Sequence, residues 1–176
     1  LLESQKIFNE LGYKTEFKNL NKYLPSYLDT DSAAIMVIRN GLEALLKDSN
    51  YKINDLYYEL NNLNPDKKYW DRRRKRVLNK NARHNLCFAD FEQKPDYENG
   101  KGTIISYKNI PITNNIRQKL PKLFGITASN LEAEANYYYD ITKCGIGFHG
   151  DSERKKVIGF RLGESIPLHY QWFHKS

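Results

Sequence analysis

The stretch EAEANYYYD, residues 132–140, alternates along its length with a period of two. Successive side chains of a β-strand point to opposite faces, so this alternation predicts a strand with one polar and one packed face. Such strands are typical of antiparallel sheets and barrels, and a polar face that looks inward lines a cavity. The polar face would carry Glu132, Glu134, Asn136 and Tyr138, and the other face Ala133, Ala135, Tyr137 and Tyr139.

The rest of the chain predicts helices first and strands later. This order favours an α+β fold, in which helices buttress one side of a β-sandwich or jelly roll, that is, a double-stranded β-helix. The apolar run AAIMVIRNG, residues 33–41, predicts a buried strand and a tight turn, although Asp31 also fits a helix cap. We expect helices at residues 4–11, 42–46, 53–60 and 113–125, and strands at 85–88 and 103–107.

A run of basic residues lies at positions 71–84, with the sequence DRRRKRVLNKNARH. Asn64 followed by Pro65 is typical of a helix start, so we expect this run to lie on a helix. Such a run is either a solvated helix face or a surface that contacts the phosphates of nucleic acid. In the second interpretation the binding residues are Arg72, Arg73, Arg74, Lys75 and Arg76.

The composition fits one globular domain. The chain has 176 residues, 40% of them apolar, and a net charge of +7, which favours a polyanionic partner. No apolar run approaches the roughly 20 residues of a membrane span, so we expect no membrane partner. Cys87 and Cys144 lie far apart, which argues against a disulfide framework. Because the chain begins at Leu1, we expect a fragment of a longer protein.

The stretch CGIGFHGDSERKKVIGFRLG, residues 144–163, holds a candidate metal site. On a strand, His149 and Asp151 would point the same way and present an imidazole and a carboxylate to one point. Two histidines and one carboxylate form the facial triad of non-haem Fe(II) oxygenases, so this pair would supply two of the three ligands. An isolated His-x-Asp is a weak signal, and its surroundings decide its value.

Those surroundings resemble a known family. Residues 136–163, NYYYDITKCGIGFHGDSERKKVIGFRLG, are similar to the core motif of the AlkB-like Fe(II)- and 2-oxoglutarate-dependent dioxygenases. That family shows Asn-x-Tyr on one strand, then His-x-Asp, an acidic turn, and an apolar strand that ends in Gly. The resemblance covers residues 82–173, and the amino-acid sequence is most similar to an uncharacterised branch of the family found in large DNA viruses.

The resemblance implies Fe(II) and 2-oxoglutarate as cofactors. His149 and Asp151 match the first two iron ligands of the family, and Asn136 and Tyr138 match the pair that hydrogen-bonds 2-oxoglutarate. Glu153 stands where the family places an acidic residue near the flipped base, although a solvated turn carboxylate explains it equally well.

The chain also departs from the family pattern. The second histidine ligand and the arginine that binds 2-oxoglutarate should follow Asp151 by tens of residues, and we expect both beyond residue 176. His169 and His174 come too early for this role. Arg161 replaces a small residue, and it would either pair inward with a carboxylate, as a substrate-site residue, or lie on an outer strand face.

Three functions follow from these patterns. The first is a dioxygenase that demethylates or hydroxylates bases of nucleic acid, taken from a single strand or flipped out of a duplex. The second is an oxygenase of the same fold that hydroxylates a protein or small molecule. The third is an inactive barrel that serves as a binding or virion module. We expect residues 1–81 to pack as a helical extension on the dioxygenase core, 82–176, and an intracellular location in the host cytoplasm, nucleus or virion.

Overall fold

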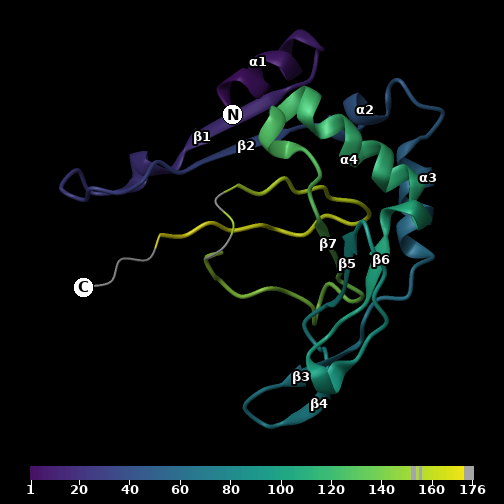
Figure 1. Ribbon diagram of the computed structural model, residues 1–176. Helices are drawn as coiled ribbons and strands as arrows, with labels where there is room; N and C mark the ends of the chain where they lie inside the picture. Colours follow the sequence, from purple (N-terminus) through teal and green to yellow (C-terminus); the bar gives the residue numbers. More distant parts are fainter. Residues whose placement is uncertain (152–153, 155, 173–176) are drawn as a thin grey trace.

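The computed structural model describes residues 1–151, 154 and 156–172, and it has an α+β fold (Figure 1). Helices lie along one side of the molecule, and three small sheets lie beside and below them (Figure 1). The elements are α1 (Leu2–Glu10), β1 (Thr15–Asn19), β2 (Ala34–Ile38), α2 (Gly41–Leu46), α3 (Ile53–Asn61), β3 (Lys68–Asp71), β4 (Arg76–Asn79), β5 (His84–Ala89), β6 (Ile104–Ser106), α4 (Pro111–Phe124) and β7 (Ala133–Tyr137).

The helices enclose the main hydrophobic core. Helix α4 contacts α1, α2 and α3, and its apolar stripe recurs at helical spacing. Phe8 of α1 and Leu45 of α2 are each 1% exposed in this cluster, together with Ile116 and Leu120 of α4. Helix α4 continues past Pro121 to Phe124, because a proline this close to the C-terminus removes only one hydrogen bond of the last turns.

The mixed three-stranded sheet has the order β6-β5-β7. Strand β6 runs parallel to β5, and β7 runs antiparallel to it, with Leu86 opposite Ala135 and Cys87 opposite Glu134. Leu86 is buried and Ala135 partly buried in a second core cluster. The other three residues of the predicted packed face, Ala133, Tyr137 and Tyr139, are exposed, so the face packs only at Ala135. Cys87 and Glu134 therefore share the opposite, polar face of the sheet.

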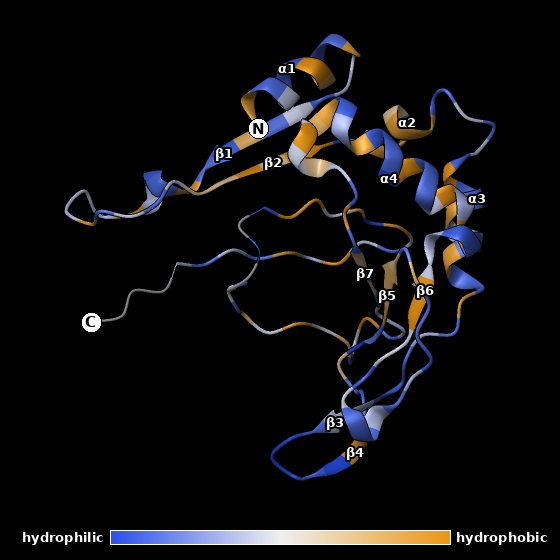
Figure 2. Cartoon of the chain, viewed as in Figure 1, coloured by the Kyte–Doolittle hydropathy of each residue, from blue (hydrophilic) through white to orange (hydrophobic). Residues whose placement is uncertain are grey.

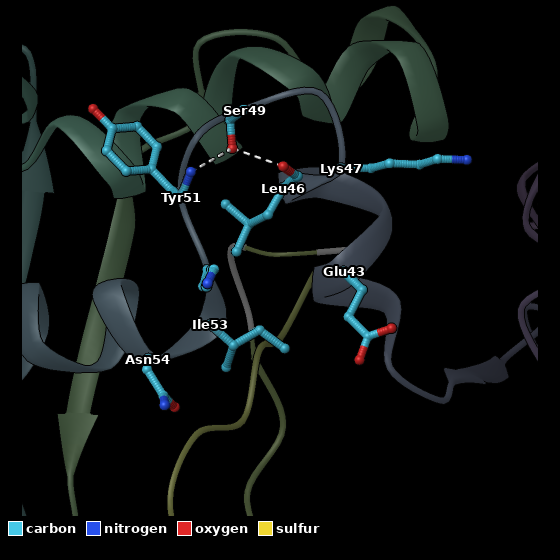
Figure 3. Close-up of a pocket in the computed structure, with 8 residues that line it drawn as sticks. Glu43, Leu46, Lys47, Ser49, Tyr51, Ile53 and Asn54 are labelled. Carbon is cyan, nitrogen blue, oxygen red and sulfur yellow. Dashed lines mark hydrogen bonds between the residues drawn. The ribbon is translucent and has the colours of Figure 1, made fainter.

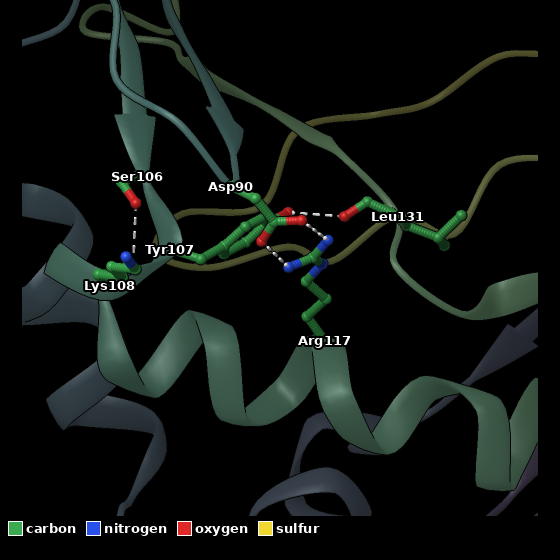
Figure 4. A network of polar contacts seen from close by, with 6 residues as sticks. All are labelled: Asp90, Ser106, Tyr107, Lys108, Arg117 and Leu131. Atoms are coloured by element: carbon green, nitrogen blue, oxygen red, sulfur yellow. Dashed lines mark hydrogen bonds and ion pairs between the residues drawn. The ribbon is translucent and has the colours of Figure 1, made fainter.

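A network of polar contacts ties α4 to this sheet (Figure 4). The guanidinium of Arg117 donates hydrogen bonds of 2.6 and 2.9 Å to the two carboxylate oxygens of Asp90, just beyond β5. The same guanidinium lies 4.2 Å from the centre of the Tyr107 ring, and the hydroxyl of Tyr107 donates to the Leu131 carbonyl, just before β7. One arginine thus fixes the end of β5 and the approach to β7 relative to the helices.

The basic run lies on a hairpin, so the predicted helix is wrong. Strands β3 and β4 pair antiparallel, with Trp70 opposite Val77, and Lys75 adopts a left-handed conformation in the connecting turn. The start signal at Asn64 and Pro65 is overridden by Asp66, which is buried and bonded to a distant loop. Its carboxylate accepts hydrogen bonds from the Tyr97 hydroxyl and the Thr103 backbone, and its own backbone N–H donates to Asn85 of β5.

The chain beyond β7 is extended but forms no strand in the part that the structure describes. The family pattern implies an apolar strand that ends at Gly163, and this expectation is wrong for the described residues that precede Gly163. An extended apolar run becomes a strand only when a neighbour supplies its backbone hydrogen bonds. Ile158 and Leu162 instead pack on the helical core. The double-stranded β-helix core stays a prediction, and no helix in the described part is long and apolar enough to cross a membrane.

Candidate functional site

His149 and Asp151 lie near each other, but the described residues around them form no strand, so the strand from which their common direction was predicted is absent here. The His149 Nε2 atom is 3.9 Å from Asp151 Oδ1, and both side chains are exposed. The other ring nitrogen, Nδ1, is 2.8 Å from the backbone carbonyl of Gly147. A carbonyl oxygen only accepts, so Nδ1 must carry the proton. In the neutral ring, the lone pair is then on Nε2, the atom beside the carboxylate.

This arrangement fits two ligands of a divalent metal ion. Histidines that bind metals commonly donate their second ring N–H to a backbone carbonyl, which fixes the tautomer and the orientation of the ring. An imidazole nitrogen and a carboxylate oxygen also suit Fe(II). Within the described residues, no group of three or more His, Cys, Asp or Glu side chains forms a metal site. The structure therefore brings together the two predicted ligands, and the third stays a prediction.

Asn136 lies on the polar face of β7, opposite Asn85 of β5. Tyr138 follows the last residue of β7 and is partly buried. The segment after Asp151 reaches the same face, because Arg154 Nη2 lies 3.8 Å from Glu134 Oε2. The two predicted pairs therefore belong to neighbouring segments, although no hydrogen bond or ion pair among the described residues joins them directly.

Arg83 is a member of this face that the sequence did not indicate. Its Nε atom donates a 2.6 Å hydrogen bond to Asn136 Oδ1. The amide group of Asn136 is thereby oriented, with its Nδ2 donors directed away from Arg83. The two residues are 53 positions apart, so only the pairing of β5 with β7 brings them together.

Other polar groups on this face are held by one another. The Nδ2 atom of Asn85 donates a hydrogen bond of 3.3 Å to Glu134 Oε1, and its Oδ1 atom accepts one from Lys80 Nζ. Burial lowers the pKa of Lys80, and the carboxylates of Asp66 and Glu134 oppose this shift. Burial also raises the pKa of the Cys87 thiol, and Glu134 adds to the effect. Cys87 is therefore a protonated thiol at neutral pH and no activated nucleophile.

The remaining candidates are not brought to the site. Arg161 is exposed, and its Nη1 atom donates to the carbonyl of Phe160 at 3.1 Å, which agrees with an outward position. His169 is exposed and lies outside any strand. Glu153 and His174 fall outside the described residues, so their predicted roles are untested.

The five basic candidates form the turn and flank of the β3–β4 hairpin, which projects away from the helices as a strongly hydrophilic loop (Figure 2). All five are exposed. Arg74 lies 3.5 Å from Asp71, whose carboxylate also accepts a hydrogen bond from the Arg74 backbone N–H. The other four make no ion pair within the ranges that the structure covers. The hairpin therefore presents Arg72, Arg73, Lys75 and Arg76 as a surface of free positive charge.

A hollow between α2 and α3 contains none of the candidate residues (Figure 3). The Ser49 hydroxyl at its rim donates to the Leu46 carbonyl and accepts from the Tyr51 backbone N–H. This hydroxyl is engaged in the turn between the helices, so the hollow offers no candidate site like the His149–Asp151 pair. Its lining residues are Glu43, Leu46, Lys47, Ser49, Tyr51, Lys52, Ile53 and Asn54.

The fold and site thus define an α+β protein with a His-x-Asp pair beside a polar sheet face. Its sequence is 40% identical over 178 residues to the uncharacterised protein R156 of Acanthamoeba polyphaga mimivirus, a match that covers the whole chain and 67% of that protein. The chain belongs to the same family as R156. No family model matches the chain, and no solved structure matches it.

Proposed function

We propose that this protein is an Fe(II)- and 2-oxoglutarate-dependent dioxygenase that resembles the AlkB-like family and acts on bases of nucleic acid. One observation carries the proposal. The Nε2 atom of His149, with its tautomer set by the Gly147 carbonyl, lies 3.9 Å from the Asp151 carboxylate. A ring nitrogen with a free lone pair beside a carboxylate supports a shared metal ion, which would draw the two groups closer together.

In this proposal His149 and Asp151 hold the iron. Bound iron, with 2-oxoglutarate and O₂, supplies the oxidant that hydroxylates a C–H bond of the substrate. Asn136 and Tyr138 hydrogen-bond the co-substrate, and Arg83 orients Asn136 so that its amide N–H groups are available to a carboxylate. The second histidine ligand and the arginine of the family pattern are part of the proposal.

The jelly-roll core belongs to the same proposal. The extended chain after β7 runs mainly to the left of the three-stranded sheet in Figure 1, and its last described part runs towards the sheet and back. In this proposal these segments supply the further strands of a double-stranded β-helix. Their exposed apolar side chains, among them Val157, Ile166 and Leu168, are the residues that such strands would pack.

Nucleic acid is the proposed substrate because of the charge. The net charge is +7, and the β3–β4 hairpin concentrates unpaired cations in one exposed turn. Such a turn contacts phosphates without reading sequence, so it suits an enzyme that must reach one altered base in many contexts.

Succinate formation by the full-length protein tests the proposal. The assay contains Fe(II), ascorbate and 2-oxoglutarate, with and without single-stranded DNA that carries N-methylated bases. We expect succinate that rises with methylated DNA, falls at least tenfold in His149→Ala, and persists in the matched control His169→Ala.

Three other outcomes have distinct meanings. If succinate formation depends on His149 but does not change with DNA, the iron site is supported and the substrate is a protein or small molecule. Fe(II) binding that depends on His149 without any succinate would overturn the oxygenase activity. No Fe(II) binding at all would favour a barrel that serves as a binding module.

A further inference from the structure

Three aromatic rings form a continuous group at the end of the β5–β7 pair, on the face opposite Asn136. The rings of His84 and Tyr139 stack with their centres 4.3 Å apart and their planes at 19°. The Tyr137 ring, on the strand that pairs with β5, lies 6.4 Å from His84 and is tilted by 32°. We call His84, Tyr137 and Tyr139 the aromatic platform.

The aromatic platform is accessible to a ligand. Tyr137 is 49% exposed and Tyr139 41% exposed, although the strand face they share is packed farther along, at Ala135. The Tyr139 ring is held in place, because its hydroxyl donates a 2.9 Å hydrogen bond to the Asn81 carbonyl. Partly exposed rings in fixed positions offer flat apolar area at a low entropic cost.

His84 takes part in the aromatic platform as a neutral ring. Burial lowers its pKa, and the nearby charges of Lys67 and Lys80 lower it further. Its Nδ1 atom is buried and has no hydrogen-bond partner among the described residues. An uncharged imidazole stacks as an ordinary aromatic, so this histidine serves packing and not ion pairing at neutral pH.

Positive charge borders the aromatic platform. The charges of Lys67 and Lys80 both act on His84, although the Lys80 ammonium itself is bonded to Asn85 on the opposite face. Both residues adjoin the β3–β4 hairpin, where the Lys80 backbone N–H donates to the Lys67 carbonyl. Strand β4 then leads from Lys80 to the basic turn over four residues, about 13 Å at the usual rise of a strand. Nearby carboxylates are engaged within the protein, since Asp71 binds Arg74 and Asp140 binds Lys143 at 2.9 Å.

We infer that the aromatic platform is a stacking site for an unpaired base of single-stranded nucleic acid, whose phosphates follow the β3–β4 hairpin. Aromatic rings beside a basic track are the recurring means of binding single strands, because every base has a face that stacks. A duplex keeps its bases paired inside and has no free face to offer. The inference rests on the proposed function for its substrate class and adds the residues that hold an unpaired base, but it depends on no metal chemistry.

Fluorescence anisotropy with labelled 12-mers tests the inference, using the full-length protein without iron or 2-oxoglutarate. The probes are oligo-dT, oligo-rU and a 12-mer of abasic spacers, which has the same phosphates but no bases. We expect Tyr137→Ala to weaken oligo-dT binding roughly 5- to 50-fold while its affinity for the abasic strand is unchanged. Tyr137→Trp should restore binding, and Tyr27→Ala, at a tyrosine 82% exposed in the β1–β2 connection, is the matched control.

A second variant tests whether the β3–β4 hairpin contacts the phosphates. Replacing Arg72, Arg73 and Arg76 by Ser should weaken the binding of the oligo-dT and abasic strands alike. It should also lower the slope of log K against log salt by about 0.7 for each phosphate that the variant no longer neutralises. The matched control replaces Lys18 and Lys22, exposed cations of the β1–β2 region.

Several outcomes would overturn the inference. In Tyr137→Ala, the affinities for the abasic and base-bearing strands could fall equally, or neither could fall. In competition, a duplex could displace oligo-dT as well as unlabelled oligo-dT does, or polyglutamate of equal charge could displace it. Each of these four results would contradict a stacking site. A preference between oligo-dT and oligo-rU assigns the single strand to DNA or RNA. The dioxygenase activity and the stacking site can fail independently. If His149→Ala abolishes succinate formation but still binds oligo-dT, or if wild type binds oligo-dT without forming succinate, the stacking site does not depend on the dioxygenase activity.

Discussion

Glu59 of α3 closes the first turn of α4 at Thr113. Its Oε1 atom accepts hydrogen bonds of 2.9 Å from the Thr113 backbone N–H and 2.7 Å from the Thr113 hydroxyl, and its Oε2 atom accepts one of 2.8 Å from the Ile112 N–H. No side chain of α4's own N-terminal residue caps the helix. A carboxylate from a second helix therefore satisfies the free N–H groups and adds a favourable interaction with the helix dipole.

Glu59→Ala should lower the free energy of unfolding by about 1–2 kcal/mol, the usual worth of a helix cap with charge. Glu59→Gln keeps the shape but removes the charge, so it should cost less. Urea unfolding followed by circular dichroism measures both. Glu43→Gln, an exposed carboxylate of α2, is the matched control. Unfolding midpoints of both Glu59 variants equal to wild type would show that α4 needs no cap from α3.

The elements with strong periodicity could be predicted from the sequence. Helices α1 to α4 and strands β2, β5, β6 and β7 occur where their patterns placed them, because each pattern is set by burial of one face of its own segment. The cap of α4 is different: the helix begins at Pro111, and Thr113 in its first turn donates to Glu59. The partner that decides this lies 54 residues away, so no local signal reveals it.

The hairpin shows why a strong local signal can fail. Asn64-Pro65 is typical of a helix start, and arginine and lysine are good helix formers. Tertiary bonds of Asp66 to Tyr97 and Thr103 override these preferences. The site divides in the same way. His149 and Asp151 are two positions apart and could be predicted, whereas Arg83 meets Asn136 only through the sheet.

Tyr97 should make stability depend on alkaline pH. Burial, followed by its hydrogen bond to Asp66, raises the pKa of this phenol to about 12. The folded state therefore favours the protonated phenol, and its contribution is complete below pH 10, the ordinary pKa. It is lost as pH rises through 12, because the unfolded chain ionises first.

The measurement is the absorbance of ionised tyrosine at rising pH, as the difference between wild type and Tyr97→Phe. Since the chain has thirteen tyrosines, only this difference isolates the one phenol. A midpoint near 10 in the difference curve would contradict the hydrogen bond to Asp66. Unfolding by urea should show that Tyr97→Phe loses less stability than wild type between pH 10 and 12.

His84 should have the opposite dependence at acidic pH. Burial, then the charges of Lys67 and Lys80, lower its pKa below the ordinary 6.5. The folded state favours the neutral ring, so the stabilisation is present above pH 6.5 and is lost as pH falls through the lower folded value. His84→Phe keeps a flat ring against Tyr139 and cannot ionise. Its stability should fall less than that of wild type between pH 7 and 5, and equal slopes would contradict burial of a neutral ring.

The tautomer of His149 is the most direct test of the candidate metal site. If the Gly147 carbonyl accepts from Nδ1, nitrogen NMR of the neutral ring should show a protonated Nδ1 and a bare Nε2. Adding Zn(II), a metal without unpaired electrons, should shift the Nε2 resonance of His149 and leave Nδ1 protonated. The shift should disappear in Asp151→Asn if the carboxylate shares the ion. His169, an exposed histidine in the same spectrum, is the internal control. A bare Nδ1, or equal shifts at His149 and His169, would mean that the nitrogen beside Asp151 is not prepared to bind a metal, and the proposed oxygenase would lose the observation on which it rests.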